Sequence, residues 1–192
     1  NMNRLKIFVF SAALAFTTSA FAGGTIGFKV GNGDLEGTND AYTAGSRTQA
    51  SVTASKDALF GAIFAEINLG DTPLSAGVEY VPFDADITLD GNNSSTSANV
   101  DDYTTAYLLL SKELESVSIY AKLGYSHADI GAINASENTT VNSQDDSLEG
   151  PMVGVGFQTE ELANGMAGRL EITYTEFDSI SATTTSNGSS SV

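Results

Sequence analysis

Apolar residues occupy every second position in several segments of this chain, and this alternation is the feature that most limits its possible folds. The clearest example is residues 117–125, where Val117, Ile119, Leu123 and Tyr125 alternate with polar or small residues. A strand points successive side chains to opposite faces, so the pattern predicts a strand with one apolar and one polar face. Apolar stripes with the period of a helix are hard to find. The alternation therefore indicates an all-β fold.

Strands and connections follow each other in a regular order. Six further segments have the pattern of strands, at residues 25–30, 58–69, 74–83, 103–112, 151–158 and 168–177. The connections 31–57, 84–102, 129–149 and 179–192 are long and polar, whereas 70–73, 113–116 and 159–167 are short. In an antiparallel up-and-down sheet, every long connection would lie at one end and every short one at the other. The first long connection contains the turn signals Asn32-Gly33 and Glu36-Gly37.

The first residues have the pattern of a secretory signal peptide. Arg4 and Lys6 form a basic start, residues 7–16 form an apolar run, and Ala20-Phe21-Ala22 fits the small-x-small cleavage pattern. The apolar run is too short to cross a bilayer as a helix, which needs about 20 residues. A buried N-terminal helix is the alternative. We predict a signal peptide over residues 1–22, which leaves residues 23–192 as the folded domain.

The charge and the cysteine content exclude some classes of partner and of stabilisation. The chain has 24 acidic residues against eight Lys and Arg residues, and its formal net charge is −16. Such a surface repels nucleic acid, so we exclude that partner class. Because the sequence contains no cysteine, an exported form must be stabilised by its core, by a partner or by lipid rather than by disulfides.

Alternation along the strands assigns side chains to the two faces. Five charged residues fall on the polar face: Glu66, Glu79, Lys122, Arg169 and Glu171. If this face lines a narrow interior, these charges must pair, for instance Lys122 or Arg169 with Glu79 or Glu171. The residues expected to face lipid on the opposite side are Ile63, Ile67, Leu74, Val78, Tyr80, Val117, Ile119, Leu123, Tyr125, Val153, Val155, Phe157, Leu170, Ile172 and Tyr174.

The alternating strands, the unequal connections and the leader ending in Ala20-Phe21-Ala22 resemble the small eight-stranded outer-membrane barrels of Gram-negative bacteria. These are the OmpA transmembrane-domain, OmpX and opacity-protein-like types, and the resemblance covers most of residues 23–192. It implies an all-β, up-and-down antiparallel transmembrane barrel in the bacterial outer membrane, with short periplasmic turns and long outer loops. It also implies a structural or adhesive role, sometimes with weak conductance.

The count of strands departs from this resemblance. Such barrels usually end on an amphipathic strand with a terminal aromatic residue, whereas this sequence ends with Ser189-Ser190-Ser191-Val192. The pattern predicts seven strands, but single-chain bacterial barrels have an even number. We therefore expect an eight-stranded barrel whose last, C-terminal strand is missing from this sequence.

The function that these features favour is that of a non-enzymatic surface protein without a cofactor. Its expected partners are outer-membrane lipid and lipopolysaccharide. A narrow porin-like channel for ions or small solutes is one alternative, although the lumen of eight strands is almost filled by side chains. A secreted soluble β-sandwich or adhesin module is another, in which the apolar faces would pack on each other.

Three groups of residues are weaker candidates. His127 next to Ser126 lacks a recognisable nucleophile motif and is expected to be a rim histidine rather than part of a hydrolase. The acidic loop residues could bind divalent cations but lack the spacing of an EF-hand, so solvated loop charges are expected: Asp84, Asp86, Asp90, Asp101, Asp102, Asp145, Asp146 and Glu149. Aromatic residues near strand ends suggest interfacial girdles: Tyr80, Phe83, Tyr103, Tyr125, Phe157, Tyr174 and Phe177.

Overall fold

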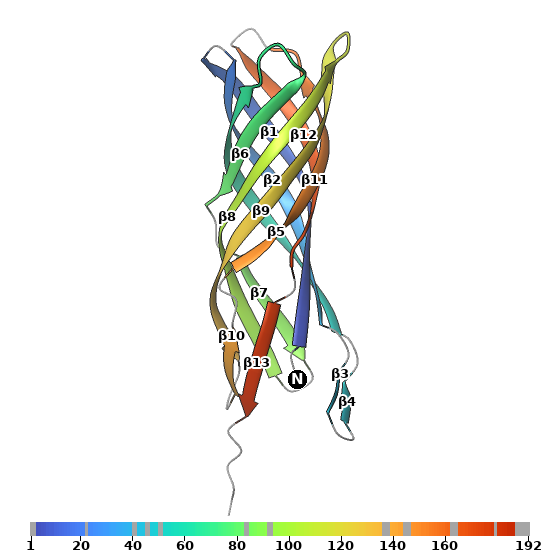
Figure 1. Cartoon of the computed structure of the whole chain (residues 1–192), viewed down its shortest axis with the longest axis vertical. Coiled ribbons are helices and arrows are strands. Elements are labelled where there is room, and N and C mark those ends of the chain that lie inside the picture. Colours follow the sequence, from blue (N-terminus) through green and yellow to red (C-terminus); the bar gives the residue numbers. More distant parts are fainter. Residues whose placement is uncertain are drawn as a thin grey trace, which may run out of the picture.

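The computed structural model describes residues 3–21, 23–39, 42–44, 47–49, 52–82, 85–91, 94–135, 139–143, 147–161, 165–178 and 180–186. Eight strands in this part of the chain form the wall of a barrel: β1 (Asn3–Phe21), β2 (Gly24–Asn39), β5 (Val52–Asn68), β6 (Leu74–Val81), β8 (Ser94–Glu113), β9 (Val117–Ala135), β11 (Ser147–Thr159) and β12 (Met166–Glu176). Their order is β1-β12-β11-β9-β8-β6-β5-β2, and β2 pairs back with β1 (Figure 1). All of these pairings are antiparallel. The predicted all-β up-and-down barrel is confirmed, and the soluble sandwich alternative is wrong, because one sheet closes on itself.

The two ends of the barrel differ. The short connections lie at one end, including residues 69–73 between β5 and β6 and residues 114–116 between β8 and β9. At the other end, which we call the long-loop end, the sheet continues into shorter strands (lower part of Figure 1). β7 (Ala85–Gly91) pairs with β8, β10 (Thr139–Ser143) pairs with β13 (Ile180–Ser186), and β3 (Tyr42–Ala44) pairs with β4 (Arg47–Gln49) in a separate two-stranded sheet.

Several predicted loops are strands instead. The turn signals Asn32-Gly33 and Glu36-Gly37 lie inside β2, where Asn32 pairs with Ala12 of β1 on one side and with Leu59 of β5 on the other. Pairing on both edges supplies backbone hydrogen bonds that outweigh the local preference for a turn. The predicted connections 84–102 and 129–149 likewise contain β7, β10 and extensions of β8, β9 and β11. The barrel wall is therefore longer than the alternating apolar segments alone indicate.

The predicted count of seven strands is also wrong, because residues 3–21 form an eighth strand. β1 pairs with β12 from Phe8 to Thr18 and with β2 from Leu5 to Phe21. Small inward residues (Ser11, Ala13, Ala15 and Thr17) alternate with outward ones, but a continuous apolar run hides this alternation in the sequence. The signal-peptide assignment concerns processing of the chain and stays a prediction.

Candidate functional site: the barrel interior

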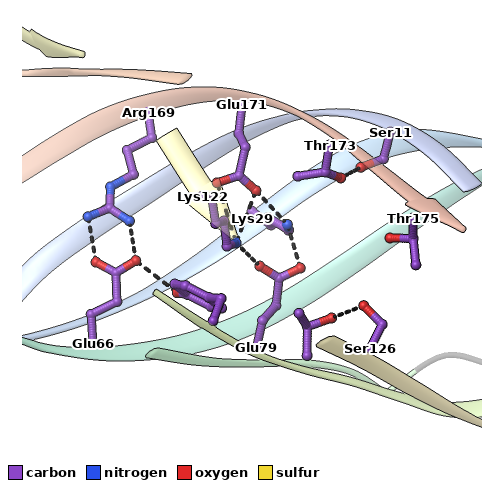
Figure 2. A network of polar contacts seen from close by, with 12 residues as sticks. Ser11, Lys29, Glu66, Glu79, Lys122, Ser126, Arg169, Glu171, Thr173 and Thr175 are labelled. Atoms are coloured by element: carbon purple, nitrogen blue, oxygen red, sulfur yellow. Dashed lines mark hydrogen bonds and ion pairs between the residues drawn. The ribbon is translucent and has the colours of Figure 1, made fainter. Parts of the chain in front are cut away.

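Charged side chains from five strands meet in the middle of the barrel. Lys29 comes from β2, Glu66 from β5, Glu79 from β6, Lys122 from β9, and Arg169 and Glu171 from β12 (Figure 2). Each is 8% exposed or less. Their positions follow from strand alternation, since each lies between two outward-facing neighbours. Three of the buried charged residues in the described part of the chain are acidic and three are basic. Their charges therefore cancel when all six are ionised.

Four of these charges form a closed ring of ion pairs. The Lys29 ammonium contacts Glu79, and its Nζ lies 3.0 Å from Oε1 of Glu171. The Lys122 Nζ lies 2.9 Å from Oε2 of Glu79 and 3.2 Å from Oε1 of Glu171. Each cation therefore contacts both carboxylates, as Figure 2 shows. Buried ions are tolerated when they are paired and hydrogen-bonded in this way.

The other two charges form a bidentate pair. Arg169 donates from Nη1 and Nη2 to the two oxygens of Glu66, at 2.7 and 2.6 Å, and from Nε to Oε1 of Gln158. Tyr107 also donates to Glu66 at 2.8 Å, and Tyr120 donates to Glu171 at 3.1 Å. The tyrosines thereby supply donors that the carboxylates would otherwise take from water. The whole polar group is internally satisfied, which is the condition for its stability in a low-dielectric interior.

Large rings fit in this narrow space because each faces a glycine. Tyr107 is paired across the sheet with Gly77, and Tyr120 with Gly156. A Cβ atom added to Gly77 would lie 2.5 Å from Cζ of Tyr107, and one added to Gly156 would lie 2.4 Å from Cζ of Tyr120. The Tyr107 ring is also 3.8 Å, centroid to Nζ, from the ammonium of Lys122, a cation–π contact. The glycines thus leave the space that lets the tyrosines reach the carboxylates.

Hydroxyl groups replace charges toward the long-loop end. Tyr103 Oη lies 3.0 Å from Ser126 Oγ and 3.1 Å from Thr175 Oγ1, and Ser126 Oγ lies 2.8 Å from Thr105 Oγ1. Ser126, Thr105 and Thr175 are each at most 1% exposed. Mutual hydrogen bonds satisfy these buried hydroxyls without a charge.

A hydrophobic cluster lies inside the barrel beyond this hydroxyl group. Ala128, Leu148 and Phe177 are buried together, with Val9 and Tyr103 packed against them. The Phe177 ring meets the Tyr103 ring edge-on at 6.0 Å between centroids. These residues come from β1, β8, β9 and β11 and from the residue that follows β12, so they are contributed from around the barrel wall. We call this group the apolar cap; it lies between the hydroxyl group and the long-loop end.

The structure brings together all five charged residues that the sequence assigned to the polar face. Lys122 contacts both Glu79 and Glu171, as expected, whereas Arg169 pairs with Glu66. Sequence reasoning missed Lys29 in the interior. Its signal was present, because Lys29 lies between Phe28 and Val30 in the alternating segment 25–30.

The opposite face of the wall is apolar and exposed. Thirteen of the fifteen residues assigned to lipid are 37% to 64% exposed, and Val117 and Tyr80 are half-buried. Three tyrosines mark the edge of this band toward the long-loop end, and each has a carboxylate beside it. Tyr80 Oη donates to Asp102 at 2.5 Å and Tyr125 Oη donates to Glu149 at 3.4 Å. Glu176 is the next outward residue after Tyr174 on β12. A wide apolar surface of this kind is unusual for a protein in water.

Comparison with protein families agrees with this geometry. The family model described as outer membrane protein beta-barrel domain matches residues 7–191. The chain belongs to this family. Membership places the barrel in the bacterial outer membrane. No curated protein matches this outer-membrane barrel.

The outer-membrane barrel is also similar to solved structures at low identity. Ail, the attachment invasion locus protein of Yersinia pestis, solved with the heparin analogue sucrose octasulfate, is 8% identical with a TM-score of 0.34, over 92% of this chain and 99% of that one. The translocator domain of the autotransporter NalP from Neisseria meningitidis is 12% identical with a TM-score of 0.30, over 91% and 88%. The outer membrane protease OmpT from Escherichia coli is 9% identical with a TM-score of 0.26, over 95% and 97%.

The weaker candidates have definite positions in the outer-membrane barrel. Ser126 points into the interior and is fully buried, whereas His127 lies on the outward face between Glu149 and Asp129, with ring nitrogen to carboxylate distances of 3.2 Å. A serine and a histidine on opposite faces of one strand do not form a nucleophile–base pair. Tyr103 points inward and Phe177 is buried in the apolar cap, so the expectation that they belong to an outer girdle is wrong.

Most of the acidic loop residues lie outside the part whose side chains are described, including Asp84, Asp145 and Asp146. In the described part, no group of three or more histidine or acidic residues is arranged to hold a metal ion. Within those same residues, no helix is long and apolar enough to cross a membrane.

Proposed function

We propose that this outer-membrane barrel is a non-enzymatic protein of structural and surface-interaction role, whose interior does not conduct. The observation that carries the proposal is the combination of fully paired interior charges with the apolar cap of Ala128, Leu148 and Phe177. Side chains fill a lumen of this width, so it leaves no path for solutes. Contact with other molecules then falls to the outer surface and to the sheet extensions at the long-loop end.

The paired charges support a closed interior on energetic grounds. An ion that crossed the barrel would have to displace Lys122 or Lys29 from Glu79 and Glu171, or Arg169 from Glu66. Removing one partner of a buried ion pair costs about 3 to 5 kcal/mol, because the remaining charge is left uncompensated. Even an ion that passed this ring would meet the buried side chains of Ala128, Leu148 and Phe177, which cannot replace its hydration.

Lipid is the proposed partner of the outer surface. The outward apolar residues match an acyl-chain environment, and the tyrosines Tyr80, Tyr125 and Tyr174 match an interfacial girdle. In this orientation the long-loop end faces outside, next to lipopolysaccharide. The formal charge of −16 gives the protein an acidic surface there and elsewhere, so divalent cations are the proposed bridge to anionic lipopolysaccharide.

A narrow ion channel is the second candidate. The observation that favours it is the number of polar side chains inside the barrel, from Arg169 and the ion-pair ring to Ser126. Rearrangement of the ion pairs, together with displacement of Leu148, would make this series continuous with the long-loop end. The channel therefore requires movement of the apolar cap, which the closed-interior proposal does not.

Conductance in planar lipid bilayers separates the two functions. We expect the purified full chain to be electrically silent, and we expect the Leu148→Ala variant to remain silent, because the ion pairs still block the interior. The exposed Val155→Ala variant serves as a matched control outside the barrel. Regular single-channel steps from the unmodified protein that disappear in Arg169→Ala would establish the channel and contradict the closed interior.

A further inference from the structure

A groove with a volume of about 830 Å³ crosses the outward face of the barrel over β1, β2, β5 and β6. Two rows of side chains border it, and the members of each row are direct partners in register from strand to strand. The row nearer the long-loop end, called the Tyr80 row, consists of Phe16, Phe28, Ile63 and Tyr80. The other, called the Ala65 row, consists of Thr18, Ile26, Ala65 and Val78. The groove has the size of a small-molecule site.

The walls of the groove suit a hydrocarbon chain. Phe28, Ile63 and Val78 are exposed on the outward face, and the rings of Phe16 and Phe28 lie 5.4 Å apart, centroid to centroid. Ala65 has the shortest side chain of its row, which keeps the groove open beside the bulky Tyr80 row. A linear chain between the two rows therefore contacts apolar side chains on both sides, and it gains dispersion contacts that a smooth wall does not offer.

The groove leads from the middle of the apolar band to its edge. At one end of the Tyr80 row, Phe16 lies in the half of β1 that is nearer the short turn. At the other end, Tyr80 is the residue before Val81, where β6 ends on the side of the long loops. Rows of register partners run perpendicular to the strands, and the strands of such barrels tilt by about 35–45°, so the groove is inclined in the bilayer. One end lies at the depth of lipid chains and the other at the depth of head groups.

A carboxylate stands at the head-group end of the groove. Tyr80 Oη donates to Oδ1 of Asp102 at 2.5 Å, and Asp102 is exposed. A carboxylate has two acceptor oxygens, so Asp102 can accept further hydrogen bonds beside that of Tyr80. Among the outward side chains that the structure describes at this end, none is a lysine or arginine, whereas Asp34, Glu149 and Glu176 add further carboxylates. The local potential therefore favours a cationic head group over an anionic one.

A second, smaller groove repeats this construction over β6, β8 and β9. Its volume is about 510 Å³, and it lies between Ala76, Leu108 and Leu123 on one side and Ala106 and Tyr125 on the other. Like the larger groove it ends at a tyrosine of the girdle, and that tyrosine also donates to a carboxylate, that of Glu149, at 3.4 Å. The combination of an apolar groove with a tyrosine–carboxylate pair at its end thus occurs twice on this face.

We propose that the larger groove is a binding site for a phospholipid whose head group carries a primary ammonium. One acyl chain lies between the Tyr80 row and the Ala65 row, and the ammonium donates to Asp102. A primary ammonium supplies both the positive charge and the N–H donors that a carboxylate accepts, whereas a quaternary ammonium supplies only the charge. The site rests on the proposed function in one respect, that the outer surface contacts lipid, and it is independent of whether the interior conducts.

Native mass spectrometry of the full chain in detergent measures the preference for head groups. The probe is an equimolar mixture of phosphatidylethanolamine, phosphatidylcholine and phosphatidylglycerol with identical acyl chains. We expect phosphatidylethanolamine to be retained about threefold to fivefold more than phosphatidylglycerol, as for one exposed charge pair, with phosphatidylcholine between them. Equal retention of the three lipids would overturn the site and leave lipid as the partner of the outer surface. Retention of none of them would contradict both.

A charge variant tests the position of the head group. Asp102→Asn keeps the shape of the side chain and removes its charge, so the preference for phosphatidylethanolamine over phosphatidylglycerol should fall to near parity. Glu113→Gln is the matched control, because it removes one exposed carboxylate at the short-turn end and should keep the preference of the unmodified chain. A preference that persists in Asp102→Asn, or that is lost equally in Glu113→Gln, would overturn the assignment of the ammonium to Asp102.

A variant that fills the groove tests the position of the acyl chain. Ala65 is exposed on the outward face, so Ala65→Phe leaves the interior untouched and places a ring in the space of the chain. Retention of phosphatidylethanolamine should fall by about threefold or more. Val155→Phe adds the same ring to the outward face of β11, outside the groove, and should bind lipid as the unmodified chain does. With circular dichroism showing both variants folded, equal retention by Ala65→Phe and Val155→Phe would overturn the proposed groove site.

Discussion

At the scale of single residues, the four charges of the ion-pair ring depend on one another. Replacing Glu79 by Gln leaves Lys29 and Lys122 to share Glu171 alone. We expect this change to lower the free energy of unfolding by about 3 to 5 kcal/mol, because one buried cation is left uncompensated. Urea unfolding of the barrel in detergent micelles, followed by circular dichroism, measures the effect.

Two variants test whether the lost charge balance is the cause. Lys29→Met combined with Glu79→Gln removes one charge of each sign, so it should destabilise the barrel less than Glu79→Gln alone. Glu149→Gln changes an exposed carboxylate on the outer face and should stay within about 0.5 kcal/mol of the unmodified chain. If the double variant were less stable than Glu79→Gln, the compensation described here would be wrong.

The two glycines beneath the interior tyrosines should respond differently to an added methyl group. At Gly77, the three nearest atoms to a new Cβ all belong to the Tyr107 side chain, which can move. At Gly156, the new Cβ would also lie 2.5 Å from the backbone oxygen of Leu170. We therefore expect Gly156→Ala to lower the unfolding free energy by more than Gly77→Ala, with Gly156→Ala at about 1 to 3 kcal/mol or more. Equal losses in paired urea titrations would show that the backbone contact is unimportant.

At the scale of strands, the number of paired neighbours should set local stability. β9 (Val117–Ala135) is paired with β8 from Ser118 to Ala135 on one edge and with β11 from Val117 to Asp129 on the other. β3 and β4 share three register pairs, from Tyr42–Gln49 to Ala44–Arg47, and form a separate two-stranded sheet. Isolated hairpins of this size are marginally stable in water. Amides of residues 42–44 should therefore exchange with an opening free energy near zero, and those of residues 119–125 with one close to that of global unfolding.

Hydrogen exchange read by mass spectrometry checks this order, and residues 130–135 of β9 serve as an internal comparison. They belong to the same strand but lie beyond the apolar band, so their protection should be intermediate. Protection of residues 42–44 as high as that of residues 119–125 would contradict the argument from pairing.

The strands also show how far the sequence determines this fold. Inward charges such as Glu66 and Lys122 could be predicted because single polar residues separate apolar ones on both sides. The facing of β8 could not, because Tyr107-Leu108-Leu109-Leu110 offers no contrast; the structure turns Tyr107 and Leu109 inward. β7 and β10 are short and lie within long polar stretches of the sequence, and in the fold each pairs with a neighbouring strand.

The interior site was predictable in membership but not in detail. Alternation places a residue on a face, yet it does not specify which residues on different strands lie at the same height in the barrel. That height depends on strand register and tilt. Arg169 was therefore expected to pair with Glu79 or Glu171, but it pairs with Glu66. The registers of β5 and β12 place these two side chains at the same height in the barrel.

At the scale of the whole molecule, the outward apolar band has a defined height. On β9 it extends from Val117 to Tyr125, where His127 follows, and on β12 it ends at Tyr174, where Glu176 follows. Nine residues of a strand tilted by about 40° span roughly 20 to 25 Å along the barrel axis. This is less than the hydrocarbon core of a typical bilayer, which is about 30 Å thick.

The chain should therefore fold more completely into thin bilayers than into bilayers of average thickness, because mismatch carries a cost for each ångström. Vesicles of short-chain and long-chain phosphatidylcholines, compared by protease resistance and circular dichroism, measure the folded fraction. Glu149→Leu with Glu176→Leu extends the band on β11 and β12 and should shift the preference toward the thicker vesicles. Val155→Leu, inside the band, should leave it unchanged. A folded fraction that is independent of thickness in all three chains would mean that the exposed apolar face is not matched to lipid.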